Sequence, residues 1–370
     1  MQLHELELAD LDSLAFRYSV MEFATAIKPT CFKHLLVGLG YDAAIYLDPD
    51  IRLFAPLHSV DEAFHEGASM VLTPHLLAPL EDEARPTDLD ILASGTFNLG
   101  FAAARNCGEM REFLNWWEIR LKQQGYNDIG RGMFVDQKFI DFAPSFLPRL
   151  HIIRDPGYNV AYWNLAHRPI TRAGSDWRAG EAPLTFFHFS GVVPGDPGIF
   201  SKHQTRYSIA DIGPAADLIS DYLQHLQNNG HATWSVVPYA FGHFEDGMRI
   251  PDVVRRAPPH GKPPQDWWRC LDMSYWNTPS DRVDQDSGSR ITRLMHAIYE
   301  TRPDIQAAFP LSHKQGRRSF HAWFLTHGAD EHRLDEALHA AAYESSAGKF
   351  PYLVRALARL RLRFGAKPAK

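Results

Sequence analysis

The sequence is poor in the features that mark secreted, disulfide-bonded or membrane-spanning chains. Its 370 residues include only three cysteines, Cys31, Cys107 and Cys270, which lie far apart. Their odd number and wide spacing suit neither a disulfide framework nor a zinc cluster. No run of about 18 uninterrupted apolar residues is present, and residues 1–14 carry acids where a signal peptide needs a basic and then an apolar segment. These absences predict a cytoplasmic protein with reduced thiols.

The chain also lacks an excess of positive charge. It has 38 lysines and arginines against 44 aspartates and glutamates, for a net charge of −6. A surface with this balance offers no overall attraction for nucleic acid. A hydrophobic content of 45% with 22% charged residues is that of an ordinary globular protein. At roughly 150 residues per domain, the length predicts two or three domains.

Helices and strands are expected to alternate between residues 14 and 205. Such alternation predicts an α/β domain built on a mostly parallel sheet, with ligand-binding loops at the carboxyl ends of its strands. The expected helices are residues 14–40, a segment after Cys107, and residues 134–146, the last ended by Pro144. The apolar runs that we interpret as strands are 43–51, 69–75, 96–104, 150–155 and 184–191.

Two segments of this region differ sharply in their apolar pattern. Residues 81–90, EDEARPTDLD, have no apolar periodicity and are predicted to be an exposed loop, either a mobile lid over the acceptor site or an ordinary acidic surface loop. The segment after Cys107 has the spacing of one helix face and predicts an amphipathic helix. The residues on that face are Met110, Phe113, Leu114, Trp117 and Leu121.

The pattern changes near residue 208. We place a domain boundary there, between residues 1–207 and a mainly helical region, 208–370. Trp267, Trp268 and Trp276, with Tyr275, fit either a sugar-binding platform or packing against the first domain. The helices expected in this region are 209–230 and segments near 289–301, 317–328, 331–345 and 350–364.

The strongest chemical signal is Asp48-Pro49-Asp50, which follows an apolar strand. Two carboxylates one residue apart at the end of a buried strand can reach one divalent cation. Mg²⁺ and Mn²⁺ use one or two carboxylates and complete their shells with waters and substrate phosphates. The same three residues also fit an ordinary turn after a core strand.

Four motifs in order resemble those of GT-A fold glycosyltransferases, in particular the retaining family 8 enzymes related to glycogenin and lipopolysaccharide galactosyltransferases. YLDPDIRLFAPL (46–57) resembles their metal-binding DxD segment, and Phe97-Asn98-Leu99-Gly100 their FNxG strand. Asp136-Gln137 resembles the DQ motif and His188-Phe189-Ser190-Gly191 the HFxG motif. The segment Tyr158-Asn159-Val160 is also similar. The resemblance covers residues 14–205 and implies a GT-A, Rossmann-like fold.

The resemblance implies a metal site and a donor site. Asp48, Asp50 and His188 would bind Mn²⁺ or Mg²⁺ together with the donor diphosphate. Asn98 would hydrogen-bond the hydroxyls of the donor sugar, with Gly100 of the same motif beside it. A histidine within LTFFHFSG (184–191) and an asparagine within a buried strand also fit roles in the core.

The DQ motif is assigned to the reacting sugar. The resemblance implies that Asp136 contacts the donor sugar and that Gln137 lies opposite the leaving diphosphate, where it would steady oxocarbenium-like charge. An aspartate followed by a glutamine also fits an ordinary helix start.

Two departures from the family pattern stand out. The family has a lysine directly after HFxG that holds the diphosphate, whereas the first basic residue here is Lys202, the candidate replacement. The nucleotide-binding strands that should precede the DxD segment are also missing, because the residues before the strand expected at 43–51 predict helix. We therefore expect an exposed sheet edge, covered by a second copy or by the second half of the chain.

These observations favour an enzyme, a metal-dependent glycosyltransferase of polysaccharide biosynthesis. It would move a hexose-like sugar from a nucleotide-sugar donor to a glycan or lipid-linked acceptor, with retention at the anomeric carbon. One alternative is a catalytically degenerate GT-A-like protein that binds sugar or acts as a scaffold. Another is a DxD phosphohydrolase, although the further motifs of that class cannot be assembled from this sequence.

The tail, residues 349–370, has the pattern of a helix on an anionic membrane surface. Residues 350–370 hold six basic side chains and no acid. Leu353, Leu357, Leu360 and Phe364 form one helical stripe, and apolar burial and basic attraction add at such a surface. A terminal helix docked on the rest of the chain fits the same pattern.

Liposome flotation distinguishes the two interpretations of the tail. If residues 350–364 lie on the inner face of the membrane, the protein should float with anionic liposomes at low salt and less so at high salt, because salt screens the attraction. Removal of residues 349–370 should abolish flotation. If the intact chain does not float with anionic liposomes at low salt, the membrane interpretation is wrong and the tail is a docked helix.

Overall fold

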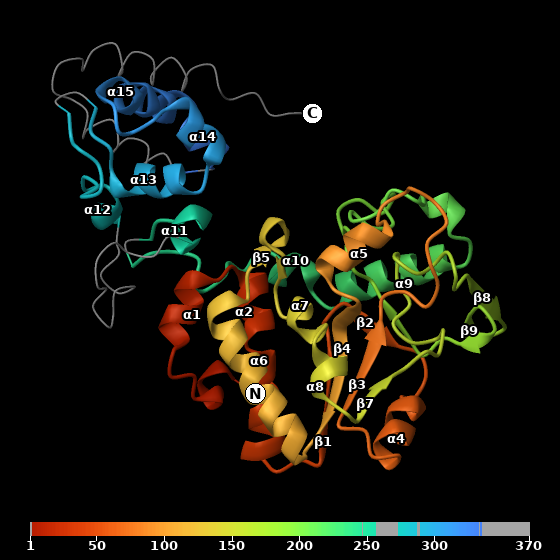
Figure 1. Ribbon diagram of the computed structural model, residues 1–370. Helices are drawn as coiled ribbons and strands as arrows, with labels where there is room; N and C mark the ends of the chain where they lie inside the picture. Colours follow the sequence, from red (N-terminus) through yellow and green to blue (C-terminus); the bar gives the residue numbers. More distant parts are fainter. Residues whose placement is uncertain (1, 246, 257–272, 287–288, 333, 335–370) are drawn as a thin grey trace. The chain divides into compact units, whose positions relative to one another are not determined.

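The computed structural model describes residues 2–245, 247–256, 273–286, 289–332 and 334. The chain forms two compact units, one of Met1–Ala9 and Val20–Val237 and the other of Asp10–Ser19 and Pro238–Lys370. Figure 1 shows the elements of both. The predicted boundary at 207/208 falls inside the first unit, which continues through the helix α9.

A mixed four-stranded sheet is the centre of the first unit (Figure 1). Its order is β1 (Ala43–Leu47), β4 (Phe97–Arg105), β3 (Met70–Pro74) and β7 (Leu150–Ile152). β4 is antiparallel to both of its neighbours, and only β3 and β7 pair in parallel. The prediction of a mostly parallel sheet was therefore wrong. Apolar runs reveal that strands are buried, but they do not reveal in which direction a strand passes through the sheet.

β4 is buried along almost its whole length because it has strands on both sides and helices over its face. Every residue from Phe97 to Ala104 is buried. The helix α6 (Gly108–Gln124) follows it directly, and the five apolar residues that predicted this helix are 4% exposed or less. The predicted amphipathic helix and its buried face are thus confirmed.

The helix expected over residues 14–40 is broken into several pieces. These are α1 (Leu11–Arg17), α2 (Val20–Ala26), α3 (Lys28–Lys33) and a π-helical turn, His34–Gly38. Pro29 lies in the first turn of α3, where its missing N–H costs nothing. No strand precedes β1 among the described residues, so β1 forms the edge of the sheet, and Ile45 is 42% exposed.

The segment expected as one strand over 43–51 is two strands separated by a sharp turn. β1 ends at Leu47, and β2 (Ile51–Leu53) pairs antiparallel with β11 (Phe186–His188) instead of continuing in the main sheet. The turn is fixed on both sides by backbone bonds. The N–H of Asp48 donates to the carbonyl of Gly100 at 2.7 Å, and the N–H of Phe189 donates to that of Asp50 at 2.8 Å.

The predicted loop at 81–90 is partly helical and firmly attached. The helix α5 (Asp88–Ser94) begins within it, because the Thr87 hydroxyl caps the N–H of Asp90 and the Asp90 carboxylate accepts from the N–H of Thr87. The side chain of Arg206 holds the part of the loop that precedes this helix. Its guanidinium donates hydrogen bonds to the Asp82 carboxylate and to the carbonyls of Ala84 at 2.8 Å and Pro86 at 3.1 Å.

The segment expected as one helix at 134–146 is divided. That segment contains two short helices, α7 (Gln137–Ile140) and α8 (Ala143–Phe146), and Pro144 lies in the first turn of the second helix instead of ending the first. The hairpins were not predicted. They comprise β5 (Asn127–Asp128) with β6 (Met133–Phe134), and β8 (Ile170–Ala173) with β9 (Asp176–Ala179) and β10 (Ala182–Pro183).

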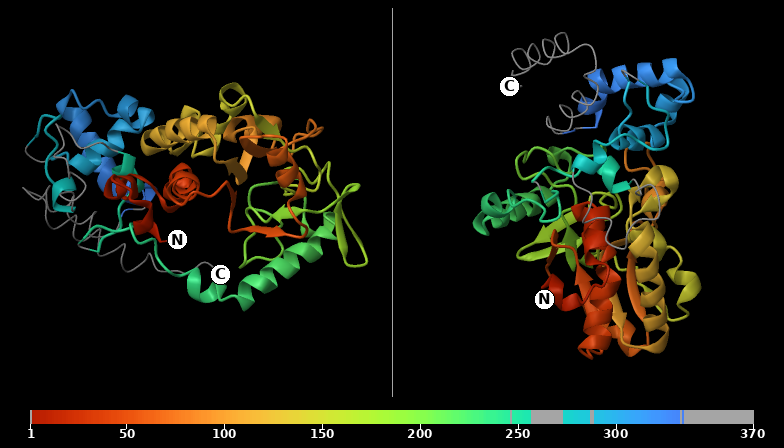
Figure 2. Two further views of the ribbon diagram at one scale, coloured as in Figure 1. Left: turned by 90° about the horizontal axis from the view of Figure 1, so that it is seen from below. Right: turned by 90° about the vertical axis from the view of Figure 1, so that its left-hand side faces the viewer.

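α9 (Ala215–Asn228) completes the first unit and explains why that unit extends beyond residue 207. Its residues Leu218 and Ile219 share one apolar core with Phe187 of β11 and Ile170 of β8. Figure 2 shows this helix in green running toward the β8–β9 hairpin. The short helix α10 (His231–Trp234) follows it.

The second unit is mainly helical, as expected. Its helices are α1, α11 (Asp252–Arg256), α12 (Met273–Trp276), α13 (Arg293–Glu300), α14 (Pro303–Ala308), α15 (Lys314–Trp323), a π-helical turn (Phe324–Gly328) and α16 (Ala329–Glu331). Trp276 is 2% exposed in the core of this unit, and Tyr275 packs against that core. Trp267, Trp268, most of 331–345 and the whole tail, 349–370, lie outside the described residues. Among the residues that are described, no helix combines the length and apolar character needed to cross a membrane.

We expect Arg206→Ala to free the loop at 81–87 while the first unit stays folded. The side chain supplies bonds to one carboxylate and two carbonyls, so the amides of this loop should exchange with solvent about tenfold faster or more without it. Hydrogen exchange followed by mass spectrometry measures the change. Arg206→Lys is the matched control, because it keeps the charge near Asp82 but not the planar fork, and it should give an intermediate rate. Unchanged exchange in Arg206→Ala would contradict the assignment.

Candidate metal and substrate site

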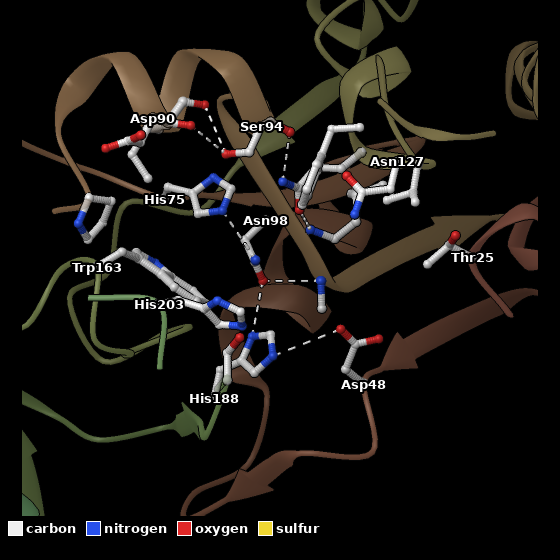
Figure 3. Close-up of a pocket in the computed structure, with 18 of the residues that line it drawn as sticks. Thr25, Asp48, His75, Asp90, Ser94, Asn98, Asn127, Trp163, His188 and His203 are labelled. Carbon is white, nitrogen blue, oxygen red and sulfur yellow. Dashed lines mark hydrogen bonds and ion pairs between the residues drawn. The ribbon is translucent and has the colours of Figure 1, made fainter. Parts of the chain in front are cut away.

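Asp48, Asp50 and His188 meet at one point, as the sequence predicted. The antiparallel register sets Ile51 opposite His188 and so places the aspartate turn beside the imidazole. His188 Nε2 lies 3.0 Å from Asp50 Oδ1 and 3.9 Å from Asp48 Oδ2. One ligand atom from each residue lies within 4.8 Å of the others. Figure 3 shows His188 and Asp48 facing each other across the site.

The donor set fits a divalent cation of the Mn²⁺ or Mg²⁺ kind. Two carboxylates and one imidazole leave room for waters and phosphate oxygens in an octahedral shell. His188 is 4% exposed, whereas Asp48 and Asp50 are 29% and 35% exposed and can be reached by a ligand. Burial disfavours ionisation of Asp50, but the hydrogen bond and charge of His188 outweigh it and lower the pKa of this carboxyl.

Tyr46 fixes the carboxylate of Asp48 through a hydrogen bond. Its hydroxyl lies 2.5 Å from Asp48 Oδ1 and donates to it. Burial, followed by the charge of Asp48, raises the pKa of Tyr46 far above its ordinary value, so the hydroxyl remains a donor. One oxygen of Asp48 is therefore engaged by the protein, and the other faces His188.

His188 is held on its other side by Asn98. Its Nδ1 lies 3.2 Å from Asn98 Oδ1, and that oxygen also accepts from the N–H of Gly100 at 3.1 Å. The ring of Trp163 stands edge-on to the imidazole, with the ring centres 5.3 Å apart. The imidazole is thus confined on several sides, as a preformed ligand requires.

The imidazole of His188 packs so closely against Gly100 that there is no room for a side chain at this position. A Cβ atom there would lie 2.4 Å from Cε1 and 2.7 Å from Nδ1 of His188, and 2.8 Å from Asn98 Oδ1. These are distances that no side chain tolerates without displacing its neighbours. The FNxG segment therefore shapes the site through a missing side chain as well as through Asn98.

Lys28, which belongs to none of the motifs in the sequence, forms a buried ion pair with Asp136. Its Nζ lies 2.7 Å from Asp136 Oδ2, and the two side chains are 3% and 2% exposed. The same ammonium donates to the carbonyl of Leu99 at 2.8 Å and lies over the ring of Tyr46. Burial raises the pKa of Asp136, and the positive charge of Lys28 opposes that rise. A lysine among apolar residues just before Pro29 was the signal available in the sequence.

Gln137 joins two elements of the site wall. Its Oε1 accepts from the N–H of Leu99 at 3.0 Å, and its Nε2 donates to the carbonyl of Ser94 at 2.9 Å. The side chain is 6% exposed and lies against the cavity. Its position beside the site agrees with the resemblance, while its bonds show that it also ties β4 to α5.

A cavity of about 520 Å³ joins these residues. Its volume is in the range of small-molecule sites. Asp48, Asp50, Asn98, Gly100, Asp136, Gln137 and His188 all line it. Lys202, the candidate phosphate contact, is exposed and is not among the lining residues. The basic side chains in the lining besides histidine are Lys28 and Arg85, and each is paired with an aspartate, Asp136 and Asp90 respectively.

Comparison with known proteins gives relatives but no activity. The chain is 26% identical over 213 residues to the uncharacterized protein YfnF of Bacillus subtilis (strain 168), an alignment of 55% of this chain and 68% of that protein. It is 27% identical over 264 residues to the uncharacterized protein YfnD of the same organism, covering 68% and 79% respectively. No family model matches the chain, and no solved structure matches it.

Substitution of Gly100 tests the packing of the site. We expect Gly100→Ala to lower the free energy of unfolding by about 1–3 kcal/mol and to weaken Mn²⁺ binding, because the new methyl group overlaps His188. Gly108→Ala is the matched control, since nothing lies within 4 Å of a Cβ atom there. Chemical denaturation and titration calorimetry with Mn²⁺ measure both effects. Equal Mn²⁺ affinity in both variants would contradict the account of Gly100.

Proposed function

We propose that this protein is a metal-dependent glycosyltransferase that transfers a sugar from a nucleoside-diphosphate sugar to a glycan or lipid-linked acceptor. The observation that carries the proposal is the convergence of Asp48, Asp50 and His188 on one wall of a cavity that also contains Asp136 and Gln137. The ordered resemblance to GT-A enzymes supports the same assignment, and with it a GT-A-like arrangement of this unit.

Asp48, Asp50 and His188 would together hold Mn²⁺ or Mg²⁺ in the cavity. A divalent cation bound there supplies the positive charge that a departing diphosphate needs. The lysine and the arginine among its lining residues, Lys28 and Arg85, already face carboxylates. Metal dependence is therefore a direct expectation of the charge distribution.

The remaining residues would bind and orient the donor sugar. Asp136 lies at the buried side of the cavity with one oxygen on Lys28, and Gln137 presents its amide along the same wall. In the transfer step the bond between the anomeric carbon and the diphosphate oxygen breaks, and the diphosphate leaves with the electron pair. The acceptor oxygen then bonds to that carbon, and its proton passes to an oxygen of the departing diphosphate. Following the resemblance, we propose retention of configuration.

One set of observations favours a second candidate, a degenerate sugar-binding protein. Lys202 stands outside the lining, and both polar atoms of the Gln137 amide are bonded to backbone. A protein of this kind would bind a donor or glycan in the cavity but would not cleave the bond to the diphosphate.

Donor binding and turnover distinguish these possibilities. We expect UDP- or GDP-sugars to bind in the presence of Mn²⁺ and to lose affinity by tenfold or more in Asp50→Asn, because the metal loses one carboxylate ligand. Asp61→Asn, at an exposed position of α4 (His58–His65), is the matched control. Calorimetry measures binding, and release of UDP or GDP over time measures turnover.

Each result of this experiment has a definite meaning. Mn²⁺-dependent binding with release of the nucleoside diphosphate supports the transferase. Binding without release supports the degenerate sugar-binding protein. If no UDP- or GDP-sugar binds with Mn²⁺ present, the proposed function is wrong.

A further inference from the structure

The side-chain amide of Asn98 is the centre of a buried polar network behind the metal ligands. Asn98 is 8% exposed. Its Oδ1 faces the N–H of Gly100 at 3.1 Å, Asn159 Nδ2 at 3.0 Å and His188 Nδ1 at 3.2 Å. Its Nδ2 lies 3.3 Å from His75 Nε2. Both polar atoms of the amide therefore have partners within the protein, and Figure 3 shows Asn98 between His75 and His188.

The orientation of this amide follows from one unambiguous donor. A backbone N–H can only donate, so the atom that faces Gly100 must be the oxygen of Asn98. An oxygen acceptor requires a hydrogen on His188 Nδ1. That requirement holds whatever the state of Nε2, the atom that lies 3.0 Å from Asp50. The network thus leaves Nε2 as the nitrogen that faces the two aspartates.

His75 supports the other end of the amide. To accept from Asn98 Nδ2, His75 Nε2 must carry a lone pair, so the ring must be neutral. His75 is 4% exposed, and burial lowers the pKa of this imidazole to about 4, which keeps the ring neutral over the physiological range. Trp163 stands edge-on to both histidines, with ring centres 5.2 Å from His75 and 5.3 Å from His188.

We infer that Asn98 is a positioning residue that holds His188 with Nδ1–H turned inward and Nε2 directed at the metal site, in place of the sugar contact that the resemblance implies. The inference rests on the proposed metal site. Hydrogen-bond partners behind a metal-bound histidine fix its ring and its tautomer, and their loss typically costs about 10–100-fold in metal affinity.

Two substitutions at Asn98 separate positioning from mere packing. Asn98→Ala removes the acceptor, so the affinity for Mn²⁺, measured by electron paramagnetic resonance of the free ion, should fall by about 10–100-fold. Asn98→Asp loses the donor to His75 Nε2 but keeps an oxygen acceptor for His188 Nδ1–H and for the N–H of Gly100, so it should retain most of the affinity that Asn98→Ala loses.

Asn164→Ala is the matched control. Asn164 is a buried asparagine with three hydrogen bonds to the backbone of Ala161, His75 and Asn159, and none of its bonds reaches a metal ligand. Its loss should lower stability while the affinity for Mn²⁺ remains that of wild type. A fall in affinity equal to that of Asn98→Ala would mean that general loosening is responsible, which would overturn the inference.

A second measurement needs no metal. In metal-free protein labelled with ¹⁵N-histidine, wild type should show a hydrogen-bonded Nδ1–H proton of His188, assigned by its disappearance in His188→Gln. The same signal should be exchange-broadened or absent in Asn98→Ala and present in Asn98→Asp. Absence of this proton from the wild-type spectrum would overturn the inference.

The outcomes separate the inference from the proposed function. If wild type binds Mn²⁺ and Asn98→Ala binds it equally well, the positioning role is wrong and the metal site stands. If wild type binds no Mn²⁺, the proposed function fails, and a role for Asn98 toward a metal fails with it. The inference is supported if Asn98→Ala loses both the Nδ1–H signal and the Mn²⁺ affinity while Asn98→Asp and Asn164→Ala do not.

Discussion

The short antiparallel pairing of β2 with β11 is the interaction on which the site depends. It sets Ile51 opposite His188 and binds the N–H of Phe189 to the carbonyl of Asp50, so residues far apart in the chain come together. The bond from Asp48 N–H to the carbonyl of Gly100 fixes the aspartate turn to β4. A side chain at Gly100, or a shift of one residue in the β2–β11 register, would separate the ligands, because such a shift turns each side chain to the other face.

Patterns carried by single segments were predictable from the sequence. The stripe on α6 could be identified because five large apolar residues share one helix face, and β3 and β4 because each is a short apolar run bounded by polar residues. The meeting of Asp48, Asp50 and His188 was predictable because each follows or ends an apolar strand. What the sequence did not contain was the direction of β4, since burial on both faces looks the same in either direction.

Features that depend on pairs of distant residues were missed. Lys28 and Asp136 are each ordinary in their own segments, and only the fold makes them a buried ion pair. The start of α5 carried a local signal, the Thr87–Asp90 capping box, but its acidic composition suggested a loop. Nothing in the sequence around Lys202 shows whether its side chain reaches the site. It is the first basic residue after the HFSG segment, yet it lies outside the cavity lining. The first unit extends beyond residue 207 because α9 packs on β11, a long-range contact.

The proposed function requires a divalent cation between the aspartate turn and His188. Diffraction from crystals soaked in Mn²⁺, recorded at the manganese absorption edge, locates such an ion directly. We expect an anomalous peak about 2.2 Å from carboxylate oxygens of Asp48 and Asp50 and from Nε2 of His188. A well-ordered site without a peak, or a peak whose ligands are other residues, would contradict it.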